Sequence, residues 1–271
     1  MKFSVYAIDR DLPPSFPFPL RGSSYEQCAA IAKELGYDGI ELQIQDPSFY
    51  NGRQLKSMFD YYGIQVSAVT TGLAYLFEGM SMTHPDKKIR AATVERLKRQ
   101  LDLAKELDSQ ILVGFIRGRK QPDWTDEIFE EILTESVAQV LEYAEEIQTV
   151  FVMEQINRND GDVFCSTERT MEFLEKFNSD WLKYNGDTYH MATEDSDIPA
   201  AVRRSLSKLV LFHVSDVGRN LPDDKHFNFY EPAKVLKEVG YDQWVSIECK
   251  PLPTSYEACK QGIEYLRRVF L

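Results

Sequence analysis

The sequence is poor in the residues that build disulfide frameworks and zinc sites, with 4 cysteines and 4 histidines among 271 residues. The cysteines are far apart and form no CxxC pair: Cys28, Cys165, Cys249 and Cys259. This spacing excludes a zinc knuckle, and a chain of this length does not depend on disulfides for its core. We therefore expect reduced thiols and a cytoplasmic location.

Long apolar runs and an excess of basic charge are also missing. No stretch approaches the roughly 18 apolar residues of a membrane helix. Asp9 and Arg10 interrupt the first segment before an apolar run of signal-peptide length forms. Lys and Arg number 31 against 43 Asp and Glu, which gives a net charge of −12. This balance argues against nucleic acids and anionic membranes as partners, because both require a basic face.

Apolar, β-branched runs alternate along the whole chain with segments of helical periodicity. The expected strands cover residues 3–8, 39–44, 64–70, 110–116, 149–156, 182–187, 209–216 and 245–250. The clearest helical patterns cover residues 89–107, 126–147 and 256–270. Strands that alternate with helices indicate βαβ units and a parallel sheet. Eight units, with no segment left over and no G-x-G-x-x-G after the first strand, favour a single (β/α)8 barrel over residues 1–271.

Four ionisable residues stand at the ends of the last four expected strands: Glu154, Asp187, His213 and Glu248. Catalytic groups of such barrels lie at the carboxyl ends of the strands. Three carboxylates at one depth would repel each other, and burying them is costly unless a cation lies between them. We expect a divalent metal ion, with Mn²⁺ first and Mg²⁺, Co²⁺ or Zn²⁺ as alternatives. For any one of these residues alone, a structural ion pair is the alternative interpretation.

Alternation along the strands predicts which side chains face the barrel interior. If Glu248 points inward, Ser246 does so too and Ile247 faces the helices. The same alternation turns His213 inward together with Leu211.

Glu41 also lies on an expected strand, but at a different depth. It follows Asp38 by three residues, whereas Glu248 follows Asp242 by six. We therefore expect Glu41 to lie deeper in the barrel or to face a helix, with a structural role.

Two loops could border the mouth of the barrel. Residues 13–19 contain four prolines and either cap one side of the mouth or form a rigid surface loop. Arg117, Arg119 and Lys120 follow the fourth strand, and a basic loop could bind a substrate phosphate. The usual barrel phosphate site lies after strands seven and eight, where no glycine-rich loop occurs. A phosphorylated sugar therefore stays open beside a free one.

The C-terminal half contains four polar motifs: MEQINRND (153–160), NGDTYHM (185–191), FHVSDVGRN (212–220) and SIEC (246–249). Together they resemble the metal-dependent ketose 3-epimerases of the tagatose and allulose type. Those enzymes are part of the xylose isomerase-like TIM barrel superfamily of sugar and sugar phosphate isomerases and epimerases. The resemblance follows the strand order of the whole chain.

The resemblance implies a role for each matching residue. The metal ligands would be Glu154, Asp187, His213 and Glu248. The substrate-binding residues would be Asp160, His190 and Arg219. Asp160 stands where the family usually has Glu, so the resemblance does not fix which sugar hydroxyls it would contact. ECKPLP after Glu248 replaces a glycine-containing run, and this departure weakens the assignment of a free ketose as substrate. A homodimer or homotetramer is expected by the same resemblance.

The chemistry of these residues suits epimerisation. Inverting a carbon beside a ketone requires removing a proton and returning one to the opposite face. Glu154 and Glu248 stand on non-adjacent strands and could act as paired base and acid. A cation would stabilise the cis-enediolate as a Lewis acid, and His190 and Arg219 would donate hydrogen bonds to it. The hypothesis is C3 epimerisation of a ketose or ketose phosphate.

Other functions stay open on the same scaffold. A hydroxypyruvate-type isomerase, an aldose–ketose isomerase and an inosose dehydratase begin with the same proton abstraction and differ in product. An apurinic-site endonuclease would need histidines on the third and fourth strands, where the sequence reads SAVTT and LVGFI. A non-catalytic sugar-binding barrel is disfavoured by the intact set of four ligands.

Overall fold

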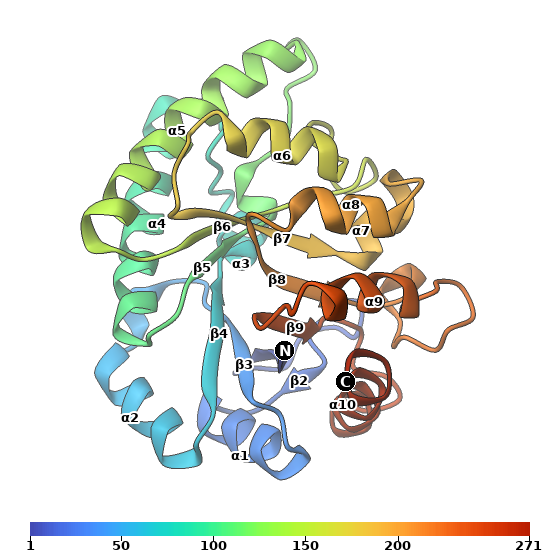
Figure 1. The fold of residues 1–271 in the computed structure, drawn as a ribbon. Coiled ribbons are helices and arrows are strands. Elements are labelled where there is room, and N and C mark those ends of the chain that lie inside the picture. The colour runs from blue at the N-terminus through green and yellow to red at the C-terminus, as the bar shows by residue number, and fades with distance from the viewer.

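Eight parallel strands close into a barrel in the computed structural model, which describes residues 1–271 (Figure 1). The barrel strands are β1 (Lys2–Ile8), β3 (Gly39–Gln43), β4 (Gln65–Thr70), β5 (Ile111–Val113), β6 (Phe151–Glu154), β7 (Leu182–Asp187), β8 (Leu209–Val214) and β9 (Trp244–Ile247). Val5 of β1 lies opposite both Ile40 and Ile247, which closes the barrel. A two-residue strand, β2 (Leu20–Arg21), pairs only with the end of β1. The predicted (β/α)8 architecture is confirmed.

Ten α-helices cover the outside of the barrel and its loops (Figure 1). They are α1 (Tyr25–Leu35), α2 (Gly52–Tyr62), α3 (Gly72–Glu78), α4 (Lys87–Glu106), α5 (Asp126–Ile147), α6 (Thr167–Glu175), α7 (Thr188–Glu194), α8 (Ile198–Ser205), α9 (Tyr230–Glu238) and α10 (Ser255–Phe270). None of them combines the length and apolar character needed to cross a membrane. The prediction for residues 126–147 matches α5, which begins after Thr125 because this side chain accepts a hydrogen bond from the Ile128 amide.

The prediction of a strand over residues 110–116 was too long. β5 ends at Val113, and Phe115–Arg117 form a short 3₁₀ helix. A Cβ on the intervening Gly114 would lie 2.4 Å from Oε2 of Glu154. An alanine at this position would force that carboxylate to move, and the apolar run of the sequence continues past the end of the strand.

One apolar layer lies inside the barrel and a second lies between the strands and the helices. The inner layer fills the lower part of the barrel and consists of Ala68, Leu112, Val152, Leu211 and Trp244. The outer layer, between strands and helices, contains 60 buried residues, among them Ile247. Trp244 and Ile247 thus face opposite sides of β9, which places Ser246 with Trp244 on the inner side, as the alternation predicted. Polar groups gather above the apolar inner layer, at the carboxyl ends of the strands.

The proline-rich segment covers one side of the barrel mouth. Phe16, Pro17 and Phe18 line the cavity there. The guanidinium of Arg21 fixes the segment, because it donates to the carbonyls of Phe18 at 3.1 Å, Pro13 at 3.0 Å and Phe16 at 3.0 Å. Of the two alternatives for residues 13–19, capping of the mouth is the one observed.

Candidate metal and substrate site

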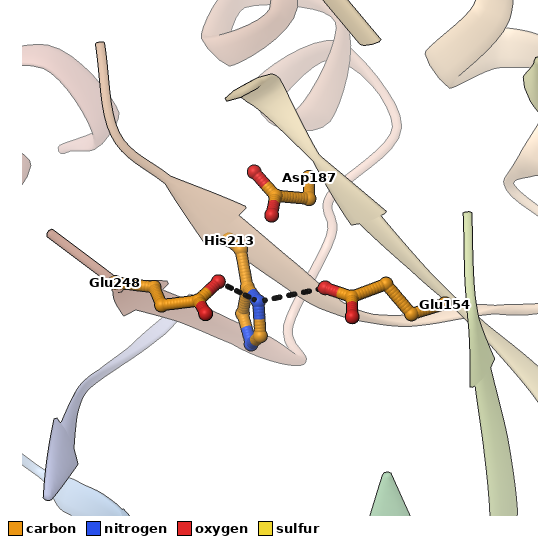
Figure 2. Close-up of side chains that lie close together, drawn as sticks. All are labelled: Glu154, Asp187, His213 and Glu248. Carbon is orange, nitrogen blue, oxygen red and sulfur yellow. Dashed lines mark ion pairs between the residues drawn. The ribbon is translucent and has the colours of Figure 1, made fainter. Parts of the chain in front are cut away.

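The four residues expected to bind a metal come together at the carboxyl ends of β6 to β9 (Figure 2). Glu154 and Asp187 end β6 and β7, His213 precedes the last residue of β8, and Glu248 follows β9 directly. One potential ligand atom from each residue lies within 4.8 Å of the others, and all four residues are buried. Neighbouring parallel strands thus bring together groups spread over almost a hundred residues.

His213 lies between carboxylates on both sides of its ring. Nδ1 is 2.8 Å from Oε2 of Glu248 and 3.2 Å from Oε1 of Glu154, as the dashed lines in Figure 2 show. Nε2 is 3.1 Å from each carboxylate oxygen of Glu41. Burial alone would lower the pKa of His213, but the charges of Glu41 and Glu248 outweigh it and raise this pKa well above its ordinary value.

Arg219 brings a positive charge to the same carboxylates. Nη1 donates to Oδ2 of Asp187 at 2.5 Å and to Oε2 of Glu248 at 2.6 Å. Burial raises the pKa of Asp187 to about 7, against the effect of Arg219. Burial would also raise the pKa of Glu248, but Arg219 and His213 outweigh it and lower this pKa. Glu248 is therefore the carboxylate held more firmly in its charged form.

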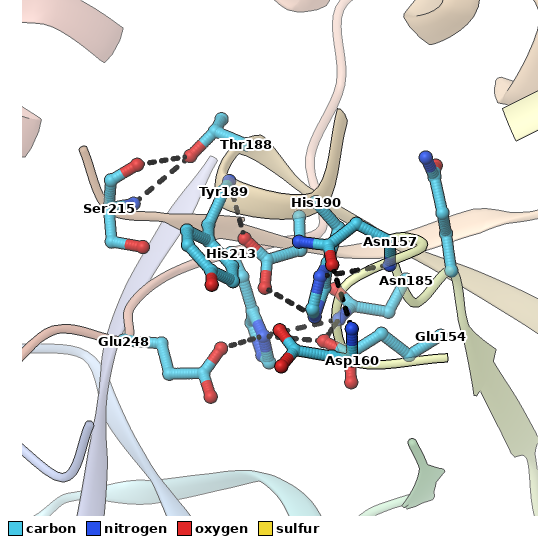
Figure 3. A network of polar contacts seen from close by, with 12 residues as sticks. Glu154, Asn157, Asp160, Asn185, Thr188, Tyr189, His190, His213, Ser215 and Glu248 are labelled. Carbon is cyan, nitrogen blue, oxygen red and sulfur yellow. Dashed lines mark hydrogen bonds and ion pairs between the residues drawn. The ribbon is translucent and has the colours of Figure 1, made fainter. Parts of the chain in front are cut away.

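Further polar groups orient the metal-ligand candidates (Figure 3). The amide nitrogen of Asn185, on β7, donates to Oε1 of Glu154 at 2.9 Å and lies 3.2 Å from Nδ1 of His213. The backbone amide of Tyr189 donates to Oδ1 of Asp187 at 2.8 Å. Asp187 is thereby the N-cap of α7, which fixes one of its two oxygens.

The three residues expected to bind substrate lie beside this cluster. His190 is fully buried, and its Nδ1 accepts a hydrogen bond from the backbone amide of Asn157 at 3.1 Å. Burial and the charge of Arg219 lower the pKa of His190 well below its ordinary value, and Nε2 of this ring lies 3.0 Å from Nη2 of Arg219. Asp160 is partly buried in the loop after β6, and burial and this carboxylate raise the pKa of Tyr189. The structure thus places His190 and Asp160 beside Arg219 and its neighbour Tyr189.

A cavity of about 210 Å³ opens above the cluster. Its polar side consists mainly of Gln43, Thr70, Glu154, His213, Arg219 and Glu248. Its apolar side consists mainly of Phe16, Pro17, Phe18, Leu76, Leu112 and Phe115. Arg219 is the only arginine or lysine in the lining. A small molecule with hydroxyl groups on one face and C–H groups on the other would match these walls.

The donor set fits a divalent cation. Three carboxylates and one imidazole offer oxygen and nitrogen ligands, which suit Mn²⁺, Mg²⁺ or Co²⁺. Their burial and mutual distances are those of groups that need a positive charge between them. The cluster could therefore hold a metal ion.

The sequence profile of the family described as xylose isomerase-like TIM barrel matches residues 29–269. The chain belongs to this family. The L-ribulose 3-epimerase of Mesorhizobium japonicum is 25% identical over 234 residues, which cover 83% of this chain and 75% of the relative. This relative and the site support an isomerase or epimerase enzyme.

Solved structures show the same fold at low sequence identity. The D-psicose 3-epimerase of Clostridium cellulolyticum H10, crystallised with D-tagatose, has a TM-score of 0.82 at 20% identity and covers 100% of this chain and 99% of its own. An L-ribulose 3-epimerase has a TM-score of 0.85 at 19% identity, and the match covers 99% of this chain and 94% of that structure's chain. The expected membership of the xylose isomerase-like family is confirmed.

One contact of this barrel was not foreseen from the sequence. Glu41 lies in the barrel interior, which was one of the two expected positions, but its contact with His213 was not anticipated. The available signal was a charged residue inside the apolar run GIELQI, at an inward position of the strand. Asn185 begins the motif NGDTYHM, but the sequence predicted no role for its side chain.

None of the three basic side chains after β5 (Arg117, Arg119 and Lys120) lines the cavity. Arg117 is buried and donates to a backbone carbonyl in the loop after β6 at 2.7 Å. Arg119 pairs with Asp162 at 3.9 Å, and Lys120 pairs with Asp126. These cations are engaged by groups of the protein itself.

Proposed function

We propose that this protein is a divalent-metal-dependent epimerase that inverts C3 of a ketose. One observation carries the proposal: the carboxylates of Glu154 and Glu248 border the same cavity from strands β6 and β9. β7 and β8 lie between these strands, and both carboxylates face Nδ1 of His213. Two carboxylates that reach a bound sugar from different sides could serve as general base and general acid.

The proton transfers follow from this pairing. In one direction Glu154 or Glu248 removes the proton from C3, and the electron pair of the C–H bond moves toward the C2 carbonyl oxygen to give a cis-enediolate. The other glutamic acid then returns a proton to the opposite face of C3, and the reverse reaction exchanges the two roles. Arg219 and His190 would donate hydrogen bonds to the oxygen that gains negative charge.

The cation would be held by Glu154, Asp187, His213 and Glu248, with Mn²⁺ as the first expectation. When bound, it supplies Lewis-acid stabilisation of the negative charge that develops on the sugar oxygens. The side chain of Asp160 is one methylene shorter than that of the Glu usual in the family, and it would bind a sugar hydroxyl beside Tyr189.

A free ketose fits the cavity better than a ketose phosphate. Arg219 is the only arginine or lysine of the lining, and it already bonds two carboxylates. A phosphate group would require a free cation or a cluster of backbone amides. The apolar wall around Phe16 and Phe115 offers neither.

A nuclease is disfavoured by the strands on the other side of the barrel. β4 ends in Thr70, and Gly114 follows β5, so neither position supplies an imidazole for additional zinc ions. Cleavage of an abasic oligonucleotide above background would contradict this conclusion.

The test is a screen of free and phosphorylated ketoses with Mn²⁺ in D₂O, followed by proton NMR. A 3-epimerase exchanges the C3 proton and forms the C3 epimer, an aldose–ketose isomerase labels a neighbouring carbon, and a dehydratase releases water. Glu154→Gln and Glu248→Gln should each lower turnover by roughly 10²–10⁴-fold with the fold intact. Glu175→Gln, which alters a surface ion pair with Arg204, is the matched control. Substantial activity in either site variant would reject the assignment.

A further inference from the structure

We propose that Glu41 is a positioning residue that holds the His213 imidazole so that Nδ1 is the nitrogen offered to the cation. The inference rests on the proposed metal site, but it concerns a residue on the far side of the barrel interior. It assigns Glu41 a role in metal binding in place of the structural role expected from its sequence position.

The contact crosses the barrel. Glu41 lies within β3, three strands away from β8 around the closed sheet, and is completely buried. Both of its carboxylate oxygens are 3.1 Å from Nε2 of His213. No arginine or lysine forms an ion pair with Glu41, so the imidazole is its only charged partner.

The geometry separates the two nitrogens of His213. An N–H at Nε2 can donate to Glu41, whereas Nδ1 faces Glu248 at 2.8 Å and Glu154 at 3.2 Å. A cation among the carboxylates would therefore meet Nδ1, while the N–H at Nε2 stays directed at Glu41. A carboxylate that accepts the outer N–H of a metal-binding histidine fixes the tautomer and strengthens the ligand nitrogen.

A purely space-filling role explains Glu41 poorly. Burying a carboxylate costs several kcal/mol unless a partner compensates it, and an apolar side chain would fill this interior position without that cost. The ion pair of Glu41 points at a residue of the site. The charge is therefore placed where it acts on His213.

The test measures metal affinity directly. Mn²⁺ binding to the full chain is followed by the EPR signal of the free ion for wild type, Glu41→Gln and Glu41→Ala. The Gln variant retains an acceptor without charge, so its Kd should rise roughly tenfold, and the Ala variant should lose roughly a hundredfold. Co²⁺ added as a spectroscopic probe should show shifted visible bands in both variants, because the donor strength of His213 changes.

Glu194→Gln is the matched control, since Glu194, at the end of α7, is a partly buried carboxylate that forms an ion pair with Arg158. Its Mn²⁺ Kd and Co²⁺ spectrum should equal those of wild type. A merely structural role for Glu41 would lower the melting temperature and leave both readouts unchanged, and that result would overturn the inference. The isosteric Glu41→Gln keeps the test valid if Glu41→Ala does not fold.

The outcome is separable from the proposed reaction. If wild type binds Mn²⁺ and the graded loss occurs but no sugar is converted, the epimerase assignment fails and the positioning role stands. If wild type binds neither Mn²⁺ nor Co²⁺, the metal site and the positioning role are both rejected.

Discussion

Arg219 and Glu248 form a buried ion pair in which Nη1 lies 2.6 Å from Oε2, the same oxygen that lies 2.8 Å from Nδ1 of His213. The backbone supports this placement. Arg219 has a φ of 59° and follows Gly218 with a φ of 71°, so both residues adopt the left-handed conformation. The Lys250 amide donates to the Arg219 carbonyl at 2.7 Å and ties this turn to the segment after β9. A strained turn at a functional site is maintained where the surrounding contacts determine it.

Replacing Arg219 should destabilise the protein in a way that a metal ion offsets. Arg219→Gln leaves Asp187 and Glu248 without their shared cation, which should lower the free energy of unfolding by about 3 kcal/mol in the presence of a chelator. Mn²⁺ should recover part of this loss, because it would neutralise the same carboxylates. Urea unfolding with EDTA and with Mn²⁺ measures both values. The surface variant Arg204→Gln should lose less than about 1 kcal/mol, and an equal loss in both variants would contradict the prediction.

Gly114→Ala should damage activity more than stability. The new Cβ would lie 2.4 Å from Oε2 of Glu154, so the carboxylate must move away from its position at the cavity. A displacement of about 1 Å in a reacting group can cost roughly 10²-fold in rate. We expect kcat to fall by about this factor with a native circular dichroism spectrum. Unchanged kcat with the ketose that the screen identifies would show that Glu154 is not held against Gly114.

Metal affinity should rise with pH between 6 and 8. The carboxylates of Glu41 and Glu248 raise the pKa of His213 against the effect of burial, and burial raises the pKa of Asp187 to about 7. At the lower pH both groups therefore hold protons, and a binding cation must displace these protons. For each displaced proton, the metal affinity falls by up to about tenfold for every pH unit below the pKa of the group. Calorimetry at three pH values, repeated in buffers of different ionisation enthalpy, measures Kd and proton release, and a flat profile would refute the prediction.

Mn²⁺ should also stabilise the folded protein. A ligand at 100 times its Kd adds about 2.7 kcal/mol when it binds only the native state. For a chain of this size we expect the melting temperature to rise by roughly 5 °C. Asp187→Asn removes one ligand and should abolish most of the shift. An identical shift in Asp187→Asn would place the bound ion elsewhere on the protein.

Local patterns were sufficient for most of the architecture. Residues 182–187 form β7 and residues 126–147 form α5, as their periodicity predicted. The Thr125 cap is a local interaction, so the start of α5 can be predicted from neighbouring residues. The error at β5 arose because the apolar run continues through Phe115 and Ile116, which form a 3₁₀ helix after Gly114 instead of extending the strand.

The sequence by itself determined the alternation of strands and helices and the strand ends at which Glu154, Asp187, His213 and Glu248 would stand. These features depend on residues a few positions apart and on the rule that parallel strands end at one edge. Only the tertiary structure decided that Glu41 meets His213, which lies 172 positions later in the chain. That contact needs closure of β1 onto β9, because β3 is related to β8 through β1 and β9. A shift of one residue would turn Glu41 to the other face of the sheet, so the partner of this carboxylate follows from packing of the whole barrel.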